Sequence, residues 1–258
     1  MRLATFNLLH GRSPVDGVVD PDRLMASVVP LDADVLALQE VDRGQERSGR
    51  VDQTALVATA TDAVDARFLP ALVGTPGEQW REAGETDAGA EPSYGVGLVS
   101  RLPVARWRRI PLGSSPARLP LLIDARRPAL VRDEPRVALA AELAGPAPVG
   151  TVVATHLSFA PGVNVVQLLR LAHALRDARP PVVVLGDLNM PGPVPPAVLP
   201  GWRSLVREPT FPGDLPRIQL DHVLARGGPG APLPEVVQGG AVAGPVSDHR
   251  ALLVELGG

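Results

Sequence analysis

Short apolar runs of strand length recur along the whole of this 258-residue chain. Several of them are rich in Val and Leu and are bounded by Pro or Gly, which is typical of buried strands. The segments that we expect to form strands are residues 2–7, 35–40, 67–73, 95–100, 106–112, 137–143, 149–156, 182–186, 220–225 and 251–256. A chain built from such strands has to cover both faces of its sheets.

Helical periodicity is confined to a few segments. Residues 165–175 carry apolar side chains at spacings of three and four, and two Pro residues follow this segment. Residues 21–29 form a second candidate helix, with Asp20 as its N-cap and Pro21 at its first position, and residues 52–64 form a third. Many strands and few helices, without strict alternation, predict an α/β (α+β) fold whose sheets pack on each other with helices outside.

No internal repeat and no long linker divides the chain, so we expect a single domain over residues 1–258. No apolar run reaches the roughly 18 residues of a membrane-spanning helix. The first residues lack the apolar segment of a signal peptide, and a cytoplasmic protein is therefore the expectation.

Two amino acids are missing from the composition, because the chain has no Cys and its 25 basic residues are all Arg. The absence of Cys excludes a disulfide framework, a thiolate zinc site and a Cys nucleophile. The absence of Lys excludes a P-loop lysine and Schiff-base chemistry. Five His residues remain as candidates for catalysis.

Charge is distributed unevenly, although the net charge is only −3. Residues 101–136 contain nine Arg and three acidic residues, so this segment has a net charge of +6. It fits either a solvated face or a surface that faces phosphate groups. Residues 74–93 contain five acidic residues and one Arg, and their Gly and Glu content predicts a mobile loop.

Polar residues stand where the apolar strands begin or end. These residues are Asn7, Glu40, His156, Asp187, Asn189, Asp221, Asp248 and His249. If the strand ends converge, the carboxylates form a cluster in which they repel one another unless a cation is bound. Mg²⁺ prefers a few carboxylate or amide oxygens, whereas the His spacings here are unlike those of a zinc hydrolase. Each residue alone is also typical of a turn or a solvated strand end, so the prediction depends on the whole ordered set.

The order of five motifs resembles the endonuclease/exonuclease/phosphatase superfamily, which includes deoxyribonuclease I, abasic-site endonucleases, neutral sphingomyelinases and inositol-polyphosphate 5-phosphatases. The motifs are Thr-Phe-Asn at 5–7, Leu-Gln-Glu-Val at 38–41, the hairpin sequence at 94–103, Gly-Asp-Leu-Asn at 186–189 and Ser-Asp-His at 247–249. The resemblance spans nearly the whole chain. It implies a four-layer sandwich, in which two mixed β-sheets pack face to face with helices outside.

The resemblance also implies a metal site. Glu40 would be the principal Mg²⁺ ligand, with Asn7 beside it and Asp248 near the ion. Mn²⁺ is expected to substitute for Mg²⁺. In proteins such an ion polarises a phosphoryl oxygen and stabilises the leaving oxyanion.

The remaining motif residues would carry the catalytic roles of that superfamily. Asp187 would position or deprotonate the attacking water, and Asn189 would help to hold the phosphate. His156 would donate to a non-bridging oxygen. His249 would pair with Asp221, which fixes its tautomer. Whether Asp187 or His249 acts as the base stays open at this point.

Three further residues are candidates for substrate binding: His10 beside the first motif, Tyr94 at the start of the hairpin sequence, and Arg217. Val96 and Ala251 depart from residues that are frequent in the superfamily, and both departures leave the substrate open.

The leading hypothesis is Mg²⁺-dependent hydrolysis of a phosphoester bond by in-line attack of an activated water. The substrate is a phosphate ester, with nucleic acid as one candidate, and the sequence identifies no protein partner. One alternative is a DNA-specific endonuclease or exonuclease, for which the Arg-rich segment would supply phosphate contacts. An alternative of another class is a catalytically silent relative that binds a phosphate ligand.

Overall fold

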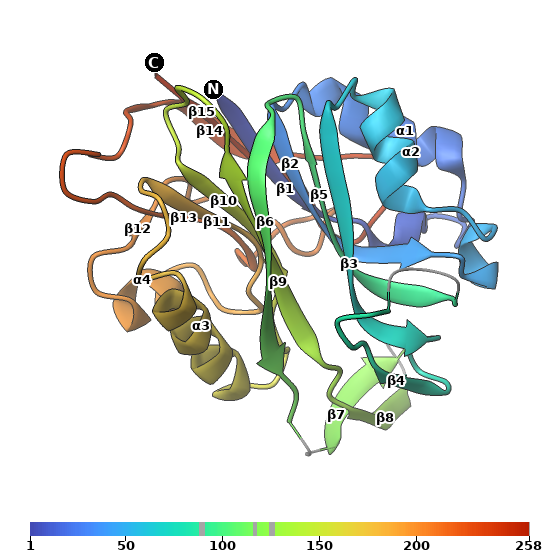
Figure 1. Cartoon of the computed structure of the whole chain (residues 1–258). Coiled ribbons are helices and arrows are strands. Elements are labelled where there is room, and N and C mark those ends of the chain that lie inside the picture. The colour runs from blue at the N-terminus through green and yellow to red at the C-terminus, as the bar shows by residue number, and fades with distance from the viewer. Residues whose placement is uncertain (88–90, 116–117, 124–126, 258) are drawn as a thin grey trace.

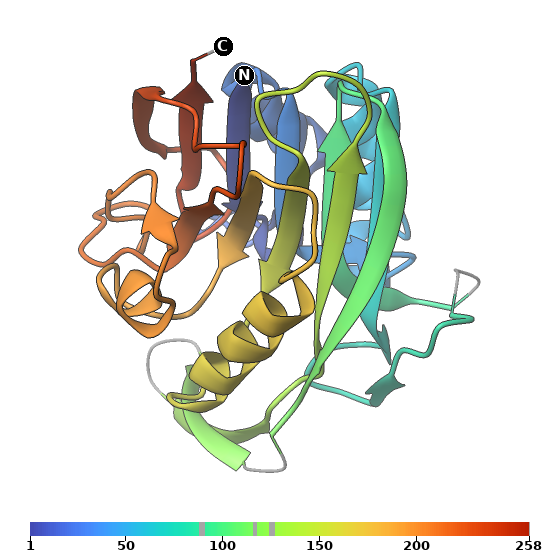
Figure 2. The same cartoon turned by 60° about the vertical axis from the view of Figure 1, so that its left-hand side comes forward.

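Two β-sheets pack face to face in the computed structural model, which describes residues 1–87, 91–115, 118–123 and 127–257 (Figures 1 and 2). The seven strands of the first sheet are, in spatial order, β14 (Val236–Val242), β15 (Ala251–Leu256), β1 (Arg2–Asn7), β2 (Val35–Arg43), β5 (Ser93–Ser100), β3 (Asp65–Gly74) and β4 (Trp80–Glu82). Strands β1 and β2 run parallel, and the other neighbours in this sheet are antiparallel.

The second sheet has six strands and carries a separate hairpin at one end. Its strands are, in spatial order, β12 (Arg203–Ser204), β13 (Asp221–Arg226), β11 (Val182–Asp187), β10 (Thr151–His156), β9 (Arg136–Leu143) and β6 (Val104–Gly113). The hairpin pairs β7 (Arg118–Ile123) with β8 (Arg127–Arg132). Figure 1 shows it below both sheets, at the end opposite the two chain termini.

The helices lie on the outer faces of the two sheets (Figure 1). They are α1 (Pro21–Val28), α2 (Gln53–Ala60), α3 (Val163–Ala174) and α4 (Val194–Val198), and the short 3₁₀ segments are η1 (Leu9–Gly11), η2 (Val29–Leu31) and η3 (Glu46–Ser48). Helices α1 and α2 cover the first sheet, whereas α3 and α4 cover the second. The expected N-cap of α1 is present, since the Asp20 carboxylate accepts from the Asp22 backbone N–H at 2.8 Å.

The alternation of side chains along each strand explains the four layers. In β2, Val35 and Ala37 enter the core between the sheets, while Leu36 and Leu38 pack under α1 and α2. Strand β11 alternates in the same way between the central core and the core beneath α3. Both faces of these strands are therefore apolar, which is why they read as continuous apolar runs. The four-layer α/β sandwich of two mixed sheets is confirmed.

The ten predicted strands are present, two of them (β1 and β15) with the predicted ends and the others with shifted ends, but five further strands were missed. Strands β4 and β12 are very short, β7 and β8 contain Pro120 and Pro128, and β14 contains the pair Gly239–Gly240, so none of these segments has a strong strand pattern. The expectation of a mobile loop over residues 74–93 was partly wrong, because β4 pairs there with β3. Residues 88–90 lie outside the described residues.

Candidate active site

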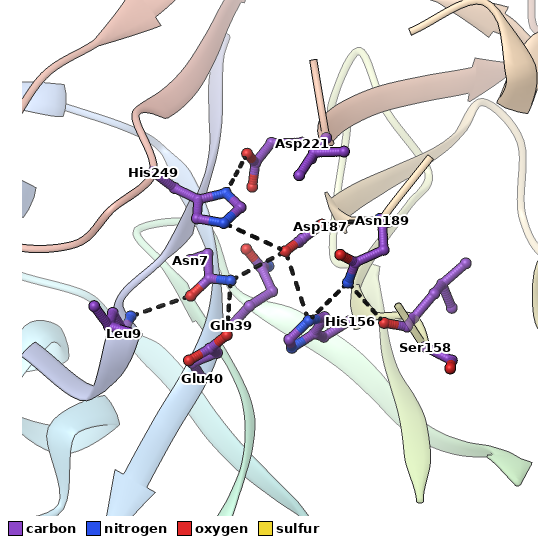
Figure 3. Close-up of polar contacts among 12 residues, drawn as sticks. Asn7, Leu9, Gln39, Glu40, His156, Ser158, Asp187, Asn189, Asp221 and His249 are labelled. Atoms are coloured by element: carbon purple, nitrogen blue, oxygen red, sulfur yellow. Dashed lines mark hydrogen bonds and ion pairs between the residues drawn. The ribbon is translucent and has the colours of Figure 1, made fainter. Parts of the chain in front are cut away.

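Strand register brings most of the expected polar residues to one place. His156 at the end of β10 is the register partner of Asp187 at the end of β11, and Asp187 is in turn the partner of Asp221 at the start of β13. Asn7 ends β1 on the facing sheet, and His249 lies two residues before β15, the antiparallel neighbour of β1. The site therefore lies at one end of the sandwich, with side chains from both sheets (Figure 3).

Glu40 reaches the site through a bulge in β2. The pairing of β2 with β5 is irregular between Leu38 and Val41, and Glu40 has a φ of 53°, in the left-handed region that few residues other than Gly adopt. Gln39, just before it, is fully buried and accepts from the Thr5 hydroxyl at 3.0 Å. Such bulges re-aim a side chain beside active sites. The strand does not end at Glu40, as the sequence predicted, but continues to Arg43.

Asn7 links the carboxylates of the two sheets. Its Nδ2 donates to Glu40 Oε1 at 3.1 Å and to Asp187 Oδ2 at 3.1 Å (Figure 3). Its Oδ1 accepts from the Leu9 backbone N–H at 3.1 Å, which fixes the orientation of the carboxamide. Both donor positions of this side chain are therefore used to hold Glu40 and Asp187 near each other.

His249 and Asp221 form a buried pair. His249 Nδ1 lies 2.8 Å from Asp221 Oδ2, and the Phe211 ring packs against the imidazole with its centroid 5.0 Å away. Burial lowers the pKa of His249, but the charges of Asp221, Asp187 and Asp248 outweigh it and raise that pKa to about 10. His249 is therefore a cation at neutral pH. Its Nε2 lies 3.8 Å from Asp187 Oδ2.

His156 lies on the other side of Asp187, with its Nε2 3.6 Å from Asp187 Oδ2. Asn189 Nδ2 lies 3.2 Å from the same nitrogen and donates to the Leu157 carbonyl at 3.0 Å. A carboxamide nitrogen only donates, so His156 accepts at Nε2 and carries its proton on Nδ1. Burial, with the charges of Arg136 and His249, lowers the pKa of His156 well below its ordinary value and keeps the ring neutral.

Asp187 stands at the centre of this arrangement. Its Oδ1 accepts from the Asn189 backbone N–H at 2.9 Å, and its Oδ2 faces Asn7, His156 and His249. Burial raises its pKa to about 6, although the positive charge of His249 and these hydrogen bonds act in the opposite direction. The carboxylate is thus ionised at neutral pH but more basic than an exposed one.

The donor set around Glu40 fits a hard divalent cation. Burial raises the pKa of Glu40 to about 7, Asn7 opposes this rise, and the charges of Asp248 and Asp187 add to it. A bound cation would relieve the repulsion between these carboxylates. The atoms that could ligate it are oxygens, which Mg²⁺ prefers. Asp187, Asp221 and His249 also have ligand atoms within 4.8 Å of one another. In that group, however, His249 is protonated and already paired with Asp221. Glu40 is therefore the better candidate for binding the cation.

A cavity of about 380 Å³ opens from this cluster. Of the eight polar residues at the strand ends, Glu40, His156, Asp187, Asn189 and His249 line it, and so do His10 and Tyr94. Burial and the charge of Arg47 lower the pKa of His10 to about 4, so its imidazole is neutral.

Arg217 lies away from this cavity, with an exposed side chain, and its backbone N–H donates to Phe211. Asp248 also lies outside the lining, although its charge acts on Glu40. Sequence reasoning missed the lining residues Arg47, Glu134 and Phe159. Arg132 and Arg136 line the cavity too, and the Arg-rich composition of residues 101–136 was the signal that pointed toward them.

The fold and this cluster of carboxylates, carboxamides and imidazoles define the class of protein. The chain belongs to the endonuclease/exonuclease/phosphatase family, whose model matches residues 4–249. The family expected from the order of the motifs is thus confirmed. No curated protein sequence matches the chain. Among the described residues, no helix is long and apolar enough to cross a membrane.

Solved structures of the same fold cover nearly the whole chain. An endonuclease/exonuclease/phosphatase from Beutenbergia cavernae is 26% identical, with a TM-score of 0.62 over 100% of this chain and 72% of that one. A mannosyl-6-phosphatase from Bacteroides thetaiotaomicron is 15% identical, with a TM-score of 0.62 over 100% of both chains. TDP2 from D. rerio, complexed with a single-strand DNA product, is 14% identical, with a TM-score of 0.59 over 98% of this chain and 97% of that one.

Proposed function

We propose that residues 1–258 form one catalytic domain, which hydrolyses a phosphate ester with the aid of Mg²⁺, or Mn²⁺ in its place. The observation that carries this proposal is the side chain of Asn7, which joins Glu40 to Asp187 while two imidazoles flank Asp187 Oδ2. This arrangement combines a cation position with a general base and hydrogen-bond donors, as phosphoryl transfer to water requires.

Glu40, Asn7 and Asp248 are the residues that would hold the cation. When bound, it would polarise a phosphoryl oxygen and stabilise the charge on the leaving oxygen. The hydrogen bond from Asn7 to Glu40 supports this assignment. Asn7 carries no charge, so it holds the Glu40 carboxylate next to Asp187 without neutralising the negative charge of that carboxylate.

Asp187 is the better candidate for the general base. Its pKa of about 6 makes it ionised at neutral pH, and its Oδ2 is held toward the cavity by the contact of Oδ1 with Asn189. His249 holds its proton too tightly to act as a base at this pH. Asp187 therefore takes a proton from the attacking water, whereas His249 donates a hydrogen bond to the charged phosphoryl group.

The neighbouring residues orient these two groups. Asp221 holds the proton of His249 on Nδ1, which leaves Nε2–H toward the cavity. His156 is neutral, and its Nδ1–H is the donor that it can offer to a non-bridging oxygen. Asn189 holds His156 and Asp187 in place through its side chain and its backbone N–H, respectively.

Cation dependence gives the first prediction. Mg²⁺ should support hydrolysis of bis(4-nitrophenyl) phosphate, and EDTA should abolish it. Mg²⁺ should also raise the Tm of the wild type by about 2–4 °C, because a ligand that binds only the native state stabilises it. Glu40→Gln should lose both effects, and Glu46→Gln, on the exposed surface, should keep them. A metal-replete wild type that hydrolyses no nucleic acid, phospholipid or soluble phosphate ester would contradict the proposal. A catalytically silent binding relative with a dead metal site would show neither the Mg²⁺-dependent Tm shift nor hydrolysis.

The pH dependence of kcat/KM gives the second prediction. A general base must be ionised, so activity should rise with pH through a value near the Asp187 pKa of about 6. The protonated His249 imidazole is required as a charged donor, and deprotonation removes its charge. Activity should therefore fall again toward the His249 pKa of about 10. Asp221→Asn removes a charge that raises the His249 pKa and should move the alkaline limb to lower pH. An alkaline limb that stays in place in this variant would exclude His249 as the group that titrates there.

A further inference from the structure

The cavity has a second wall beside the catalytic cluster. This wall contains Arg132 at the end of β8, Glu134, and Arg136 at the start of β9, and we call these three residues the arginine wall. None of them belongs to the five motifs. Arg132 ends the hairpin β7–β8, which Figure 1 shows below the two sheets, and Glu134 and Arg136 follow it in the sequence.

Arg136 is buried in this wall with few partners among the residues that the structure describes. Its side chain is 6% exposed, and its Nε has no hydrogen-bond partner among these residues. Its one described ion pair, with Glu134, has a separation of 3.7 Å, which is beyond a good hydrogen bond. Leaving a buried charged donor unsatisfied is costly. Because Arg136 lines the cavity, an anionic group there would offset its charge and accept from the guanidinium N–H groups that reach the cavity.

Arg132, which is exposed and lines the cavity, contacts an aromatic ring. Its guanidinium carbon lies 4.7 Å from the centroid of the Trp80 ring, which belongs to β4. This contact joins β4 to the end of the hairpin β7–β8. Stacking of this kind orients the planar guanidinium group while its N–H donors remain available. The wall thus has two guanidinium groups and one carboxylate, an excess of one positive charge.

We propose that the arginine wall binds a second anionic group, a phosphate or a carboxylate, on a small soluble phosphate ester. This inference rests on the proposed function and names its substrate class. One phosphate of the substrate would lie at Asp187, where the ester bond breaks. The second group would accept hydrogen bonds from Arg132 and Arg136, which match the planar geometry of such anions.

The size and charge of the cavity favour a small substrate over a polymer. A volume of about 380 Å³ lies within the range of small-molecule sites. Arg47, on another side of the cavity, is already paired with Asp42 through two contacts of 2.8 Å, so it adds little attraction for further phosphates. Arg132 covers one face of the Trp80 ring, so that face is not free to stack on a base.

Isothermal titration calorimetry with phosphonates, whose C–P bonds resist hydrolysis, tests this inference. Linear alkane bisphosphonates with spacers of two to six carbons are compared with alkylphosphonates of the same length, all in Mg²⁺ buffer. At least one bisphosphonate should bind the wild type about tenfold more tightly than its matched monophosphonate, since charge-assisted hydrogen bonds are strong.

Variants assign this preference to the wall. Arg132→Gln should reduce it to about threefold or less, and so should Trp80→Ala, whereas Trp80→Phe should retain it. The matched control is Arg106→Gln, because Arg106 belongs to the same Arg-rich segment but is 70% exposed and pairs with Glu142 outside the cavity. Its preference should equal that of the wild type.

Three outcomes would overturn the inference: no spacer gives a preference, the preference survives in Arg132→Gln, or a single-stranded dT oligonucleotide binds more tightly than every bisphosphonate.

Hydrolysis of bis(4-nitrophenyl) phosphate, which carries one negative charge, separates this inference from the proposed function. The control variant Arg106→Gln, outside the cavity, should keep that hydrolysis. A wild type with the binding preference but without hydrolysis of any ester would contradict the proposed function and leave the inference standing.

Discussion

Asp187→Asn should lower kcat by about three orders of magnitude or more, because the substituted side chain cannot take a proton from the attacking water. The change keeps the size of the side chain, and its remaining oxygen can still accept from the Asn189 backbone N–H. The fold should therefore be intact. Steady-state kinetics with bis(4-nitrophenyl) phosphate, together with circular dichroism, measure both effects.

The control for this variant is Asp177→Asn, since the Asp177 side chain is 80% exposed and pairs with Arg176 on the surface. It should have wild-type kinetics. A kcat within tenfold of the wild type in Asp187→Asn would remove Asp187 from the role of general base.

His249→Ala should lower kcat by about two to three orders of magnitude, with a smaller effect on KM. His249 is a buried cation beside Asp187, so its loss removes a charged donor to the phosphoryl group where negative charge accumulates. Loss of the imidazole also leaves Asp221 buried without its partner. We therefore expect Asp221 to become protonated and the variant to unfold at a lower urea concentration than the wild type.

A double-mutant cycle separates the catalytic effect of His249 from the loss of packing. If Asp221 acts only by orienting and charging His249, then Asp221→Asn combined with His249→Ala should have nearly the same kcat as His249→Ala alone. Additive losses in kcat would show that Asp221 acts independently of His249. The exposed His173→Ala is the matched control, and it should leave kcat unchanged.

The strands that carry the site could be predicted because each of them is an apolar run with a polar residue at its end. Asn7, His156 and Asp187 stand at strand ends in the structure as they do in the sequence pattern. Parallel neighbours end at the same edge of a sheet, and for this reason β10 and β11 bring His156 and Asp187 together. The order of the motifs then identified the family, although each motif alone is common.

The position of Glu40 could not be predicted from the strand pattern. A period of two assigns alternate residues to opposite faces, and the bulge that turns Glu40 toward Asn7 breaks this period. Nothing in the local sequence marks a non-glycine residue with positive φ.

The arginine wall was equally inaccessible to local patterns. Arg106, Arg108 and Arg136 belong to one Arg-rich segment, yet Arg106 pairs with Glu142 on the surface and Arg108 donates to a backbone carbonyl, whereas Arg136 lines the cavity. Composition alone treats these residues alike. Their separate roles depend on which face of the strand each side chain occupies and on the contact between β4 and β8, which lie far apart in the sequence.

Hydrolysis in ¹⁸O-labelled water tests the central claim most directly, namely that this chain uses its cation site to direct water onto phosphorus. Bis(4-nitrophenyl) phosphate is incubated with the wild type in the presence of Mg²⁺, and the phosphorus-containing product is analysed by mass spectrometry. The account predicts one ¹⁸O atom in each molecule of 4-nitrophenyl phosphate formed, no product with EDTA, and a rate lower by about three orders of magnitude with Asp187→Asn. Product without ¹⁸O, which indicates cleavage of the C–O bond, or product formed at the same rate after removal of the cation would contradict it.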